Sequence, residues 1–600
     1  MQWRLKTADP TAVAQLASAL REQTKEPRAA ATLAALLLHR DITDEQSAAS
    51  FLFPSLAHLH SPYLMAGMKA AVDRLDAALE RNEQILIYGD YDVDGTTAII
   101  ILKTAIELCG GQADFHVPHR IRDGYGMRDD VIERAAAAGI RLIISVDMGI
   151  RAFAPAAKAQ QLGVDLIVTD HHLPGHDGVP RALAVVNPNQ AGCEYPCKSL
   201  CGAGVAFKLA QGLMERRRRG SELARMLESF MKVVAIATVA DAVPLTGENR
   251  VFAKLGLEGL RSTVNPGLKA LLEVAKLSGR PLKSGEVAFR IAPRMNAAGR
   301  MDVARDVIEL FSVKDAARAR EIANRLDRLN SERQEEERKI LEAIEVRLKE
   351  DPELRDAYCL VIDGEGWHRG VIGITATRLV ERYGRPALVV SREGDEAHGS
   401  GRSIPVFHLL NALETCSPLF TRHGGHAHAV GFSLPASRVS ELRARLDACA
   451  RQHLTLADFE PVLALDAELP LDQATPEFFQ VMSRLEPFGA GNPEPVFAAR
   501  GVCLAAPPQV LNDKHVRLKL RTRVGADWRR SITFPALAWR MAERVGQHKL
   551  LPGDALDVAF TLGCNDHPEF GGLELSLRDF KVAVSGGADT PVRGAAATSA

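Results

Sequence analysis

The sequence is poor in cysteine, in aromatic residues and in net charge. It holds 9 cysteines in 600 residues, an odd number that cannot all pair within the chain, and aromatic residues make up only 5%. So few cysteines exclude a small fold held together by disulfides, and we expect reduced thiols. The 74 basic and 75 acidic residues almost cancel, so the total charge gives no indication of a nucleic-acid partner.

The sequence also lacks long apolar runs and an export signal. No uninterrupted apolar run approaches ~18 residues, and the first residues, MQWRLKTADP, have no basic-then-apolar pattern. We therefore expect a cytoplasmic protein that neither is exported nor crosses a membrane. Its 46% hydrophobic and 25% charged residues are typical of soluble globular proteins. The length suggests about three or four domains.

Changes of pattern along the chain predict an α/β fold class. Residues 1–80 have a helical pattern. Residues 81–312 alternate short apolar strands with helical runs, which predicts a domain built on a parallel sheet. One long charged helix is expected over 313–354, as a rigid spacer between two lobes.

The second half of the chain predicts three further parts. Residues 355–455 repeat the alternation of strand and helix and predict a smaller α/β domain. Residues 460–584 consist of short β-like runs and turns, which are typical of a small barrel. The small and polar residues 585–600 indicate a disordered tail.

Acidic residues follow the apolar runs of the first α/β domain. In an open parallel sheet the carboxyl ends of the strands meet at one edge, so these carboxylates should converge and repel one another. A pair of divalent ions would offset that repulsion. Hard oxygen ligands with one or two imidazoles favour Mn²⁺, with Mg²⁺ also possible. The residues concerned are Asp90, Asp92, Asp94, Asp147, Asp170, His171, His172 and Asp241.

The spacing within this set supports a shared site. Asp90, Asp92 and Asp94 alternate, so they can present up to three carboxylates to one small volume. We expect the adjacent His171 and His172 to point apart, one towards a metal and the other towards substrate. Any single Asp-x-Asp is commonly a scattered loop acid or a cap. Four separate apolar runs that all end in aspartate, here including the run before Asp241, favour the metal site.

Several motifs resemble a known family. YGDYDVDG, SVDMGI, TDHH and ATVADAVPL resemble the four motifs of the DHH phosphoesterase superfamily. Within it, HVPHRIRDGYGM, LCGAGVAFKL, APRMNAAGRM, GSGRS, GGHAHAVGFS and PFGAGNPEPVF resemble the RecJ family of bacterial single-strand-specific 5′→3′ exodeoxyribonucleases. The resemblance covers roughly residues 35–580. It implies a DHH domain, a smaller DHHA1 domain and an OB-like barrel, in that order.

The resemblance also implies roles for the acidic set. Asp92 and Asp147 would hold one metal, with support from Asp90. Asp94, Asp147, His171 and Asp241 would surround the other, so that Asp147 bridges the two. The expected catalytic residues are Asp92, Asp94, Asp147, His171 and His172, with His172 contacting the scissile phosphate or the water. Asp170 would orient a histidine.

Residues in Gly/Pro/Ser-rich segments are candidates for holding the strand. The expected pocket for the 5′-phosphate consists of Arg120, Arg300, Ser400 and Arg402, since arginine suits bidentate phosphate capture. These arginines are expected in loops, and Gly424-Gly425-His426 is expected to be a tight loop that approaches a phosphate. For any one arginine, the alternative to phosphate binding is a surface ion pair. Tyr125 could stack on a base, and the alternative for this residue is a packing role. The remaining candidates are Arg294, Asn296, Ser403, Gly425 and His426.

The barrel gives independent support for nucleic-acid binding. In His515–Val524 basic residues alternate with mostly apolar ones, so one strand face should be basic. Such a strand in an OB-like barrel is typical of single-strand binding. A charged edge strand that prevents aggregation is the alternative. The basic residues are Arg517, Lys519, Arg521 and Arg523.

The expected function is that of a single-stranded-DNA-specific 5′→3′ exodeoxyribonuclease. It would release 5′-mononucleotides by two-metal phosphodiester hydrolysis, in DNA recombination and repair. The family implies a single-stranded-DNA-binding protein and a RecQ-type helicase as partners. One alternative is a DHH phosphodiesterase of short oligoribonucleotides or cyclic dinucleotides. Another is a non-catalytic single-strand-binding scaffold with a DHH core, which would be expected to have lost metal ligands that this chain retains.

Overall fold

The computed structural model describes residues 1–24, 27–301, 304–522, 532–565 and 571–583. The chain forms two compact units. The larger comprises Pro54–Pro461 and Pro487–Asn492, and the smaller takes Met1–Phe53, Val462–Glu486 and the residues from Pro493 onward. The segment expected at 1–80 is therefore shared between the units. The tail expected at 585–600 and the side chain of Arg523 lie outside the described residues.

Five parallel strands form the sheet of the first lobe of the larger unit. In spatial order they are β3 (Gln112–His116), β2 (Gln84–Gly89), β4 (Leu142–Val146), β5 (Asp165–Thr169) and β6 (Ala184–Val186). Every neighbouring pair is parallel. The central strands are apolar throughout because both faces of the sheet are covered. The parallel-sheet domain predicted from the sequence is confirmed.

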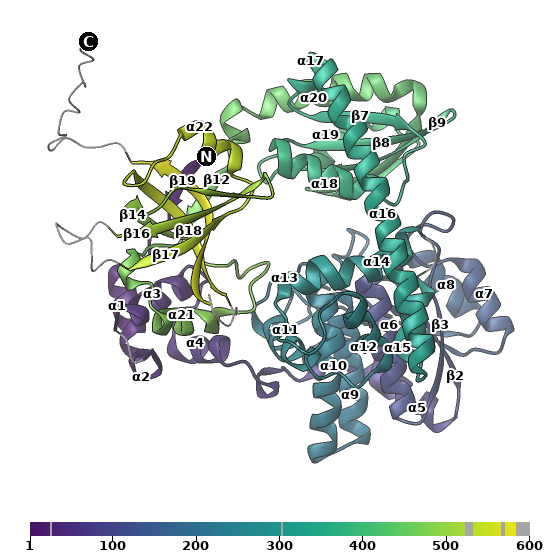
Figure 1. Ribbon diagram of the computed structural model, residues 1–600. Helices are drawn as coiled ribbons and strands as arrows, with labels where there is room; N and C mark the ends of the chain where they lie inside the picture. The colour runs from purple at the N-terminus through teal and green to yellow at the C-terminus, as the bar shows by residue number, and fades with distance from the viewer. Residues whose placement is uncertain (25–26, 302–303, 523–531, 566–570, 584–600) are drawn as a thin grey trace, which may run out of the picture. The chain divides into compact units, whose positions relative to one another are not determined.

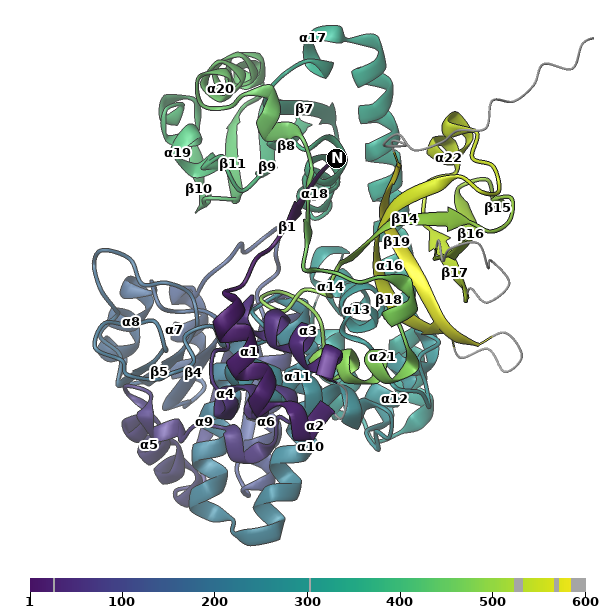
Figure 2. The same cartoon turned by 90° about the vertical axis from the view of Figure 1, so that its left-hand side faces the viewer.

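Helices cover the two faces of this sheet. Leu86, Ile143 and Leu166 pack with one group of helices, whereas Ile85, Ile144 and Ile167 belong to the larger core on the opposite face. Figure 2 shows the first group on one side of β4 and β5. That group is α7 (Asp129–Ala137) and α8 (Phe153–Gln161), and the opposite face carries α5 (Met68–Glu80), α6 (Val93–Leu108) and α9 (Gly202–Arg217).

The apolar run that ends at Asp241 is helical, which corrects the prediction of a strand end there. It forms the second half of α10 (Gly220–Ala240), and Asp241 caps the carboxyl end of that helix. A continuous apolar run does not distinguish a buried strand from a buried helix, and this run is buried in the core against α6 and α9. Within the described ranges, no helix combines the length and the apolar character that a membrane span requires.

The long charged helix is present as α16 (Ala316–Glu350), within the range expected for it. It lies against α12 (Pro266–Val274) and α14 (Ala292–Met301) (Figure 1). Its first half contributes Ile322 and Leu326 to the core of the first lobe, and its second half contributes Ile340 and Ile344 to the core of the second. The helix is therefore a packed part of both lobes as well as their connection.

The second lobe is a mixed five-stranded sheet. Only β7 and β8 are parallel to each other, and the other neighbouring pairs are antiparallel. The spatial order is β10 (Arg422–His426), β11 (Ala429–Pro435), β9 (Glu396–Arg402), β8 (Ala387–Glu393) and β7 (Leu360–Glu365). On one face α16 and α18 (Ile372–Tyr383) pack against the sheet, and on the other α20 (Val439–His453) does.

The smaller unit contains the predicted barrel. Its seven-stranded sheet closes because β14 also pairs with β16. The spatial order is β13 (Ala467–Glu468), β14 (Phe497–Leu504), β18 (Ala555–Asn565), β19 (Gly572–Val582), β17 (Thr533–Ala538), β16 (His515–Arg521) and β15 (Gln509–Leu511).

The first residues of the chain belong to this unit, which the sequence did not predict. Strand β1 (Gln2–Leu5) pairs in parallel with β12 (Val462–Leu465). The indole nitrogen of Trp3 donates a hydrogen bond to Asp579 at 2.6 Å, and the ammonium of Lys6 lies 2.9 Å from Asp466. These contacts bind the N-terminal strand to segments more than 450 residues away.

Candidate active site

Asp90, Asp92 and Asp94 surround the junction between β2 and α6. Asp90 follows β2 and is buried, Asp92 is the N-cap of α6, and Asp94 lies in its first turn. The carboxylate of Asp92 accepts a hydrogen bond from the backbone N–H of Gly95 at 3.0 Å. Aspartate is favoured at an N-cap because it satisfies an unpaired amide of the first turn. One of the three alternating carboxylates at the end of β2, that of Asp92, therefore also caps the helix that follows.

Asp94 is fixed by the amino end of a second helix, α9. Its two carboxylate oxygens accept hydrogen bonds from the backbone N–H groups of Gly202 at 2.6 Å and Ala203 at 2.7 Å. A helix amino terminus favours a negative charge. Gly202 is required sterically, because a Cβ atom there would lie 2.4 Å from Oδ1 of Asp147. The segment LCGAGVAFKL thus positions two of the acidic residues at once.

Asp147 follows β4 and has an unusual backbone conformation. Its φ of 59° lies in the left-handed region, which non-glycine residues rarely adopt. Its backbone N–H donates to the carbonyl of Thr169 on the neighbouring strand at 3.0 Å. Backbone strain of this kind clusters at functional sites, where the surrounding structure enforces it.

The imidazole of His171 lies among three carboxylates. Its Nε2 atom is 3.3 Å from Asp147, 3.7 Å from Asp94 and 3.9 Å from Asp241. Asp241 reaches this cluster from the end of α10, and Asp147 also lies within a second group with Asp90 and Asp92. The structure therefore brings together all six residues predicted as metal ligands. We call these six residues (Asp90, Asp92, Asp94, Asp147, His171 and Asp241) the acidic cluster.

His172 is held by Asp170. Its Nδ1 atom lies 2.7 Å from Oδ1 of Asp170, which is buried and also accepts from the backbone N–H groups of Ile150, His171 and His172. Burial opposes ionisation of Asp170, but the hydrogen bond and charge of His172 outweigh it and lower the pKa of Asp170. Burial likewise opposes the charged imidazolium, and the bond and charge of Asp170 outweigh it and raise the pKa of His172.

The prediction that the two adjacent histidines point apart is wrong. Their ring centroids are only 4.4 Å apart, and both rings lie beside Asp147. Side chains alternate only in extended backbone, whereas here both N–H groups turn towards one oxygen of Asp170. His172 therefore lies close enough to Asp147 and His171 to share a metal with them.

Among the described residues, protein cations do not outweigh the burial and mutual repulsion of the carboxylates in the acidic cluster. Burial, followed by the charge of a neighbouring aspartate, raises the pKa values of Asp90 and Asp147 well above the ordinary range. Burial and Asp94 raise the pKa of Asp241 to about 8. Oδ1 of Asp90 and Oδ1 of Asp147 are buried and have no hydrogen-bond partner among the described residues. Unpartnered hard oxygens together with imidazole nitrogen are the donor set that Mn²⁺ and Mg²⁺ accept, so the residues present fit such ions.

Three predicted strand-contacting residues lie beside the cluster. The hydroxyl of Tyr125, a half-exposed residue, is 3.5 Å from the carbonyl of Asp147, and its ring packs edge-on against His172 at 6.0 Å. The side-chain oxygen of Asn296 accepts from the backbone N–H of Val93 at 3.1 Å, which fixes the start of α6. Arg120 lies over the ring of Tyr91 at 4.9 Å.

Arg300 and Arg402 lie in regular structure, which corrects the prediction that they belong to loops. Arg300 is in α14 and donates to the carbonyl of Gly370 at 3.0 Å, whereas Arg402 ends β9 and its guanidinium is 3.3 Å from the hydroxyl of Ser400. Burial and the nearby charge of Arg120 lower the pKa of Arg300 to about 9, and the same two causes lower that of Arg402. The charge of Arg120 therefore acts on both Arg300 and Arg402.

Two further predicted contacts have other roles in the fold. The guanidinium of Arg294 points to α16, where it donates to Asp327 at 2.8 Å, so its ion pair matches the alternative interpretation. The hydroxyl of Ser403 donates to the carbonyl of Phe407 at 2.7 Å. The predicted tight loop at Gly425 and His426 is part of strand β10. Gly425 lies so close to the neighbouring strand β11 that a Cβ atom there would be 2.3 Å from the carbonyl of Ala429. His426 is exposed at the end of this strand.

The barrel presents the predicted alternation. Val516, Leu518 and Leu520 are buried, whereas Arg517 and Lys519 are exposed on the other face of β16. Arg521 is partly exposed, and the three basic residues Arg517, Lys519 and Arg521 are called the basic face below.

An aromatic residue that the sequence pattern did not single out lies beside the basic face. Trp539, which is 53% exposed, follows β17, and its ring packs against His515 at 4.9 Å. Because Val516 pairs with Ala538, His515 and Trp539 lie on the outward face together with Arg517. The alternation of TFPALAW after the basic strand is the signal that would have found it.

Three domain families match this chain in the predicted order. The DHH family N-terminal domain matches residues 84–238, the DHHA1 domain matches 356–452, and the RecJ OB domain matches 465–579.

Characterised relatives and solved structures cover most of the chain. The single-stranded-DNA-specific exonuclease RecJ of Bacillus subtilis (strain 168) is 35% identical over 97% of this chain and 71% of its own length. The protein of the same name from Escherichia coli (strain K12) is 35% identical over 82% of this chain and 84% of its own. RecJ of Thermus thermophilus in complex with Mn²⁺ superposes with a TM-score of 0.79 at 29% identity, covering 97% of this chain and 80% of that one. The Mg²⁺ complex of the same protein superposes with a TM-score of 0.74 at 28% identity, covering 97% of this chain and 79% of that one.

Proposed function

Because this chain belongs to the RecJ family of single-stranded-DNA-specific exonucleases, we propose that it degrades single-stranded DNA from the 5′ end and releases 5′-mononucleotides. The observation that carries the proposal is the acidic cluster, whose buried Oδ1 atoms on Asp90 and Asp147 have no hydrogen-bond partner among the described residues. A protein that only binds DNA has no use for such a costly arrangement.

Two divalent ions, Mn²⁺ or Mg²⁺, are proposed for the cluster. Asp90, Asp92 and Asp147 form one compact ligand group, and Asp94, His171 and Asp241 form another that adjoins Asp147. When bound, the ions would supply Lewis acidity to the phosphate and lower the pKa of a water molecule.

The residues around the cluster orient and stabilise the substrate. Asp170 fixes Nδ1 of His172, so the opposite ring nitrogen is directed away from this bond and can meet a phosphate oxygen. Held in this orientation, the imidazole of His172 would stabilise the negative charge that develops on the phosphate. Tyr125 is placed to stack on the base next to the scissile bond.

The 5′ polarity is proposed from the arginines. Burial and the charge of Arg120 lower the pKa values of both Arg300 and Arg402, which supports a common site for the three guanidinium groups. A terminal phosphate would satisfy this group, whereas an internal phosphodiester brings less charge. Holding the 5′ end there would place the adjacent phosphodiester at the acidic cluster.

The barrel is proposed to bind a further part of the strand. The basic face would contact phosphates, and Trp539 would stack on a base. Since a single-strand nuclease needs duplex to be opened, we propose a RecQ-type helicase and a single-stranded-DNA-binding protein as partners in recombination and repair. The cytoplasm is the proposed compartment.

Digestion of end-labelled DNA tests the proposed activity. Single- and double-stranded DNA carrying a 5′ or a 3′ label would be incubated with Mn²⁺, Mg²⁺ or chelator. We expect early release of the 5′ label as mononucleotide from the single strand only, and none with chelator. Asp147→Asn should lose at least about a hundredfold in rate, and asparagine tolerates the positive φ better than alanine does. Metal-independent release, or release of the 3′ label first, would refute the proposal.

A further inference from the structure

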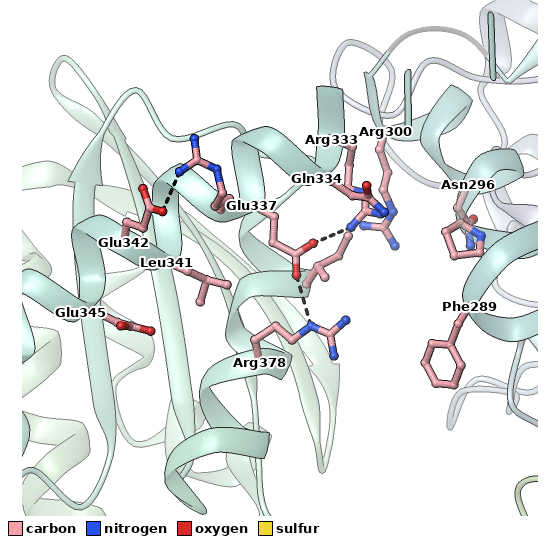
Figure 3. A pocket seen from close by; sticks show the side chains of 13 residues that line it. Phe289, Asn296, Arg300, Arg333, Gln334, Glu337, Leu341, Glu342, Glu345 and Arg378 are labelled. Carbon is pink, nitrogen blue, oxygen red and sulfur yellow. Dashed lines mark hydrogen bonds and ion pairs between the residues drawn. The ribbon is translucent and has the colours of Figure 1, made fainter. Parts of the chain in front are cut away.

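A pocket of about 750 Å³ opens between α14, α16 and α18, outside the acidic cluster. The single π-helical turn η3 (Val287–Ile291), which precedes α14, supplies Phe289 to its wall. Figure 3 shows Phe289 and Asn296 across the pocket from Glu337 and Arg378. The volume lies within the range of about 300–1,000 Å³ that small-molecule sites occupy.

The pocket shares a wall with the active site. Asn296 lines the pocket and holds the backbone N–H of Val93, the residue after Asp92. Arg300 also lines it, and the charges of Arg120, Asp92, Arg333 and Arg402 act on the same guanidinium. Arg300 therefore belongs both to the wall of this pocket and to the surroundings of the acidic cluster.

The charges that line the pocket favour an anion. Its arginines are Arg300, Arg333, Arg338 and Arg378, and its acids are Glu337, Glu342 and Glu345. Each acid is already paired: Glu337 with Arg333 and Arg378, Glu342 with Arg338, and Glu345 with Arg382 on the next turn of α18. Arg300, by contrast, has no acidic partner within salt-bridge distance among the described residues and donates to a carbonyl. The pocket is thus lined by one guanidinium that makes no salt bridge with a described residue.

Phe289 adds an aromatic surface at the mouth of the pocket. Its side chain is 74% exposed, although a phenylalanine on the surface of a helix contributes little to folding unless it is covered. The π-helical turn changes the direction of successive side chains, and such turns often occur at functional sites. An exposed ring opposite a phosphate-binding guanidinium matches the two ends of a nucleotide, the base and the phosphate.

We propose that this pocket binds the 5′-mononucleotide after cleavage, with its phosphate on Arg300 and Arg378 and its base against Phe289. The inference rests on the proposed function. An enzyme that shortens a strand from its end keeps the remaining strand in the entry path, so the released nucleotide needs another way out. A pocket behind the arginines that hold the 5′-phosphate provides it and draws the product away from the cut end.

Inhibition by added product tests this assignment in the full chain with Mn²⁺. The variants are Arg378→Ala and Phe289→Ala. Arg445→Ala is the matched control, because Arg445 on α20 has the same 48% side-chain exposure as Arg378 and a comparable pair with a glutamate. Each rate would be followed with 5′-dAMP and with deoxyadenosine, which lacks the phosphate. Equilibrium dialysis of labelled 5′-dAMP on the same proteins measures binding without turnover.

We expect Arg378→Ala and Phe289→Ala to need about tenfold more 5′-dAMP for half-inhibition and for half-saturation, as the loss of one charge-assisted bond or one stack implies. Arg445→Ala should match the wild type, and deoxyadenosine should inhibit weakly. Equal values for all four proteins would overturn the assignment. Phe289→Ala removes an exposed ring, so a folding defect cannot account for its effect. If the wild type releases no nucleotide from single strands, the proposed function fails, and dialysis then shows separately whether the pocket binds a nucleotide.

Discussion

Replacing Asp241 with asparagine should change how the stability of the metal-free protein depends on pH. Asp241 lies at the carboxyl end of α10, where the helix dipole is negative, and beside Asp94. Its pKa in the folded protein is about 8, against 3.8 for an ordinary aspartate. Between these values the folded state binds one proton more than the unfolded chain. The stability contributed by this group is therefore complete below pH 3.8 and is lost as the pH rises through about 8.

The size of the effect follows from proton linkage. Each pH unit in this window lowers the free energy of unfolding by about 1.4 kcal/mol per group. From pH 6 to pH 8 Asp241 alone should destabilise the metal-free protein by about 2 kcal/mol, because its titration is half complete at the upper value. Asp241→Asn keeps the shape of the side chain and removes the titrating group. Its stability should therefore fall by about 2 kcal/mol less over the same interval.

Urea unfolding with chelator at pH 6 and pH 8 measures this difference. Hydrogen exchange of peptides from β2 and β4 would report on the unit that contains the cluster, since two units need not unfold together. Asp177→Asn, in an exposed loop of the same lobe, is the control and should follow the wild type. Added Mn²⁺ should stabilise the wild type more at pH 8 than at pH 6. The same pH slope for Asp241→Asn and wild type would show that Asp241 does not feel the other carboxylates, and the reasoning would be wrong.

Three further predictions concern the cluster and the barrel. Gly202→Ala should lower exonuclease activity at least about tenfold with the circular dichroism spectrum preserved, since its methyl group would collide with Asp147. Gly204→Ala, where an added Cβ has room at 3.4 Å, should stay active. Glutamine at all three positions of the basic face should reduce the slope of log affinity against log salt by about 0.7 per lost phosphate contact, and an unchanged slope would contradict that role. Trp539→Ala should weaken single-strand binding by about 1–3 kcal/mol, whereas Trp539→Phe should retain most of it; equal losses would exclude stacking.

The part of the active site that the sequence predicts is the part that strand order determines. Asp90 and Asp147 come directly after strands of one parallel sheet, and His171 is the second residue after β5, so the topology alone brings them to a common edge. The apolar run before Asp241 was predicted to be a strand and is a helix, but Asp241 does belong to the acidic cluster. An aspartate that caps a buried helix reaches the cluster through helix packing, and no local pattern encodes that.

In glycine-rich segments the sequence predicted loops where the structure has strands. GSGRS was predicted to be a loop, yet it forms part of β9. Gly399 pairs with Phe432 on the next strand, and a Cβ atom at Gly399 would lie 2.0 Å from the ring of Phe432. Glycine here makes room for an aromatic core residue rather than for a turn. The pairing of β1 with β12 was likewise beyond local reasoning, since the partner strand lies more than 450 residues away.

Helix α14 connects the acidic cluster with one of the arginines proposed to hold the strand. On one side Asn296 holds the start of α6, and Gly299 packs so closely on Tyr91 that a Cβ would lie 2.2 Å from its carbonyl. One residue further, Arg300 bonds to Gly370 in the second lobe. A rigid helix therefore fixes the distance between the carboxylates after β2 and the contact with the second lobe. A displacement of either lobe along α16 would move Arg300 relative to the acidic cluster, so the packing of α14 on α16 would set the distance between the proposed 5′-phosphate site and the proposed metal site.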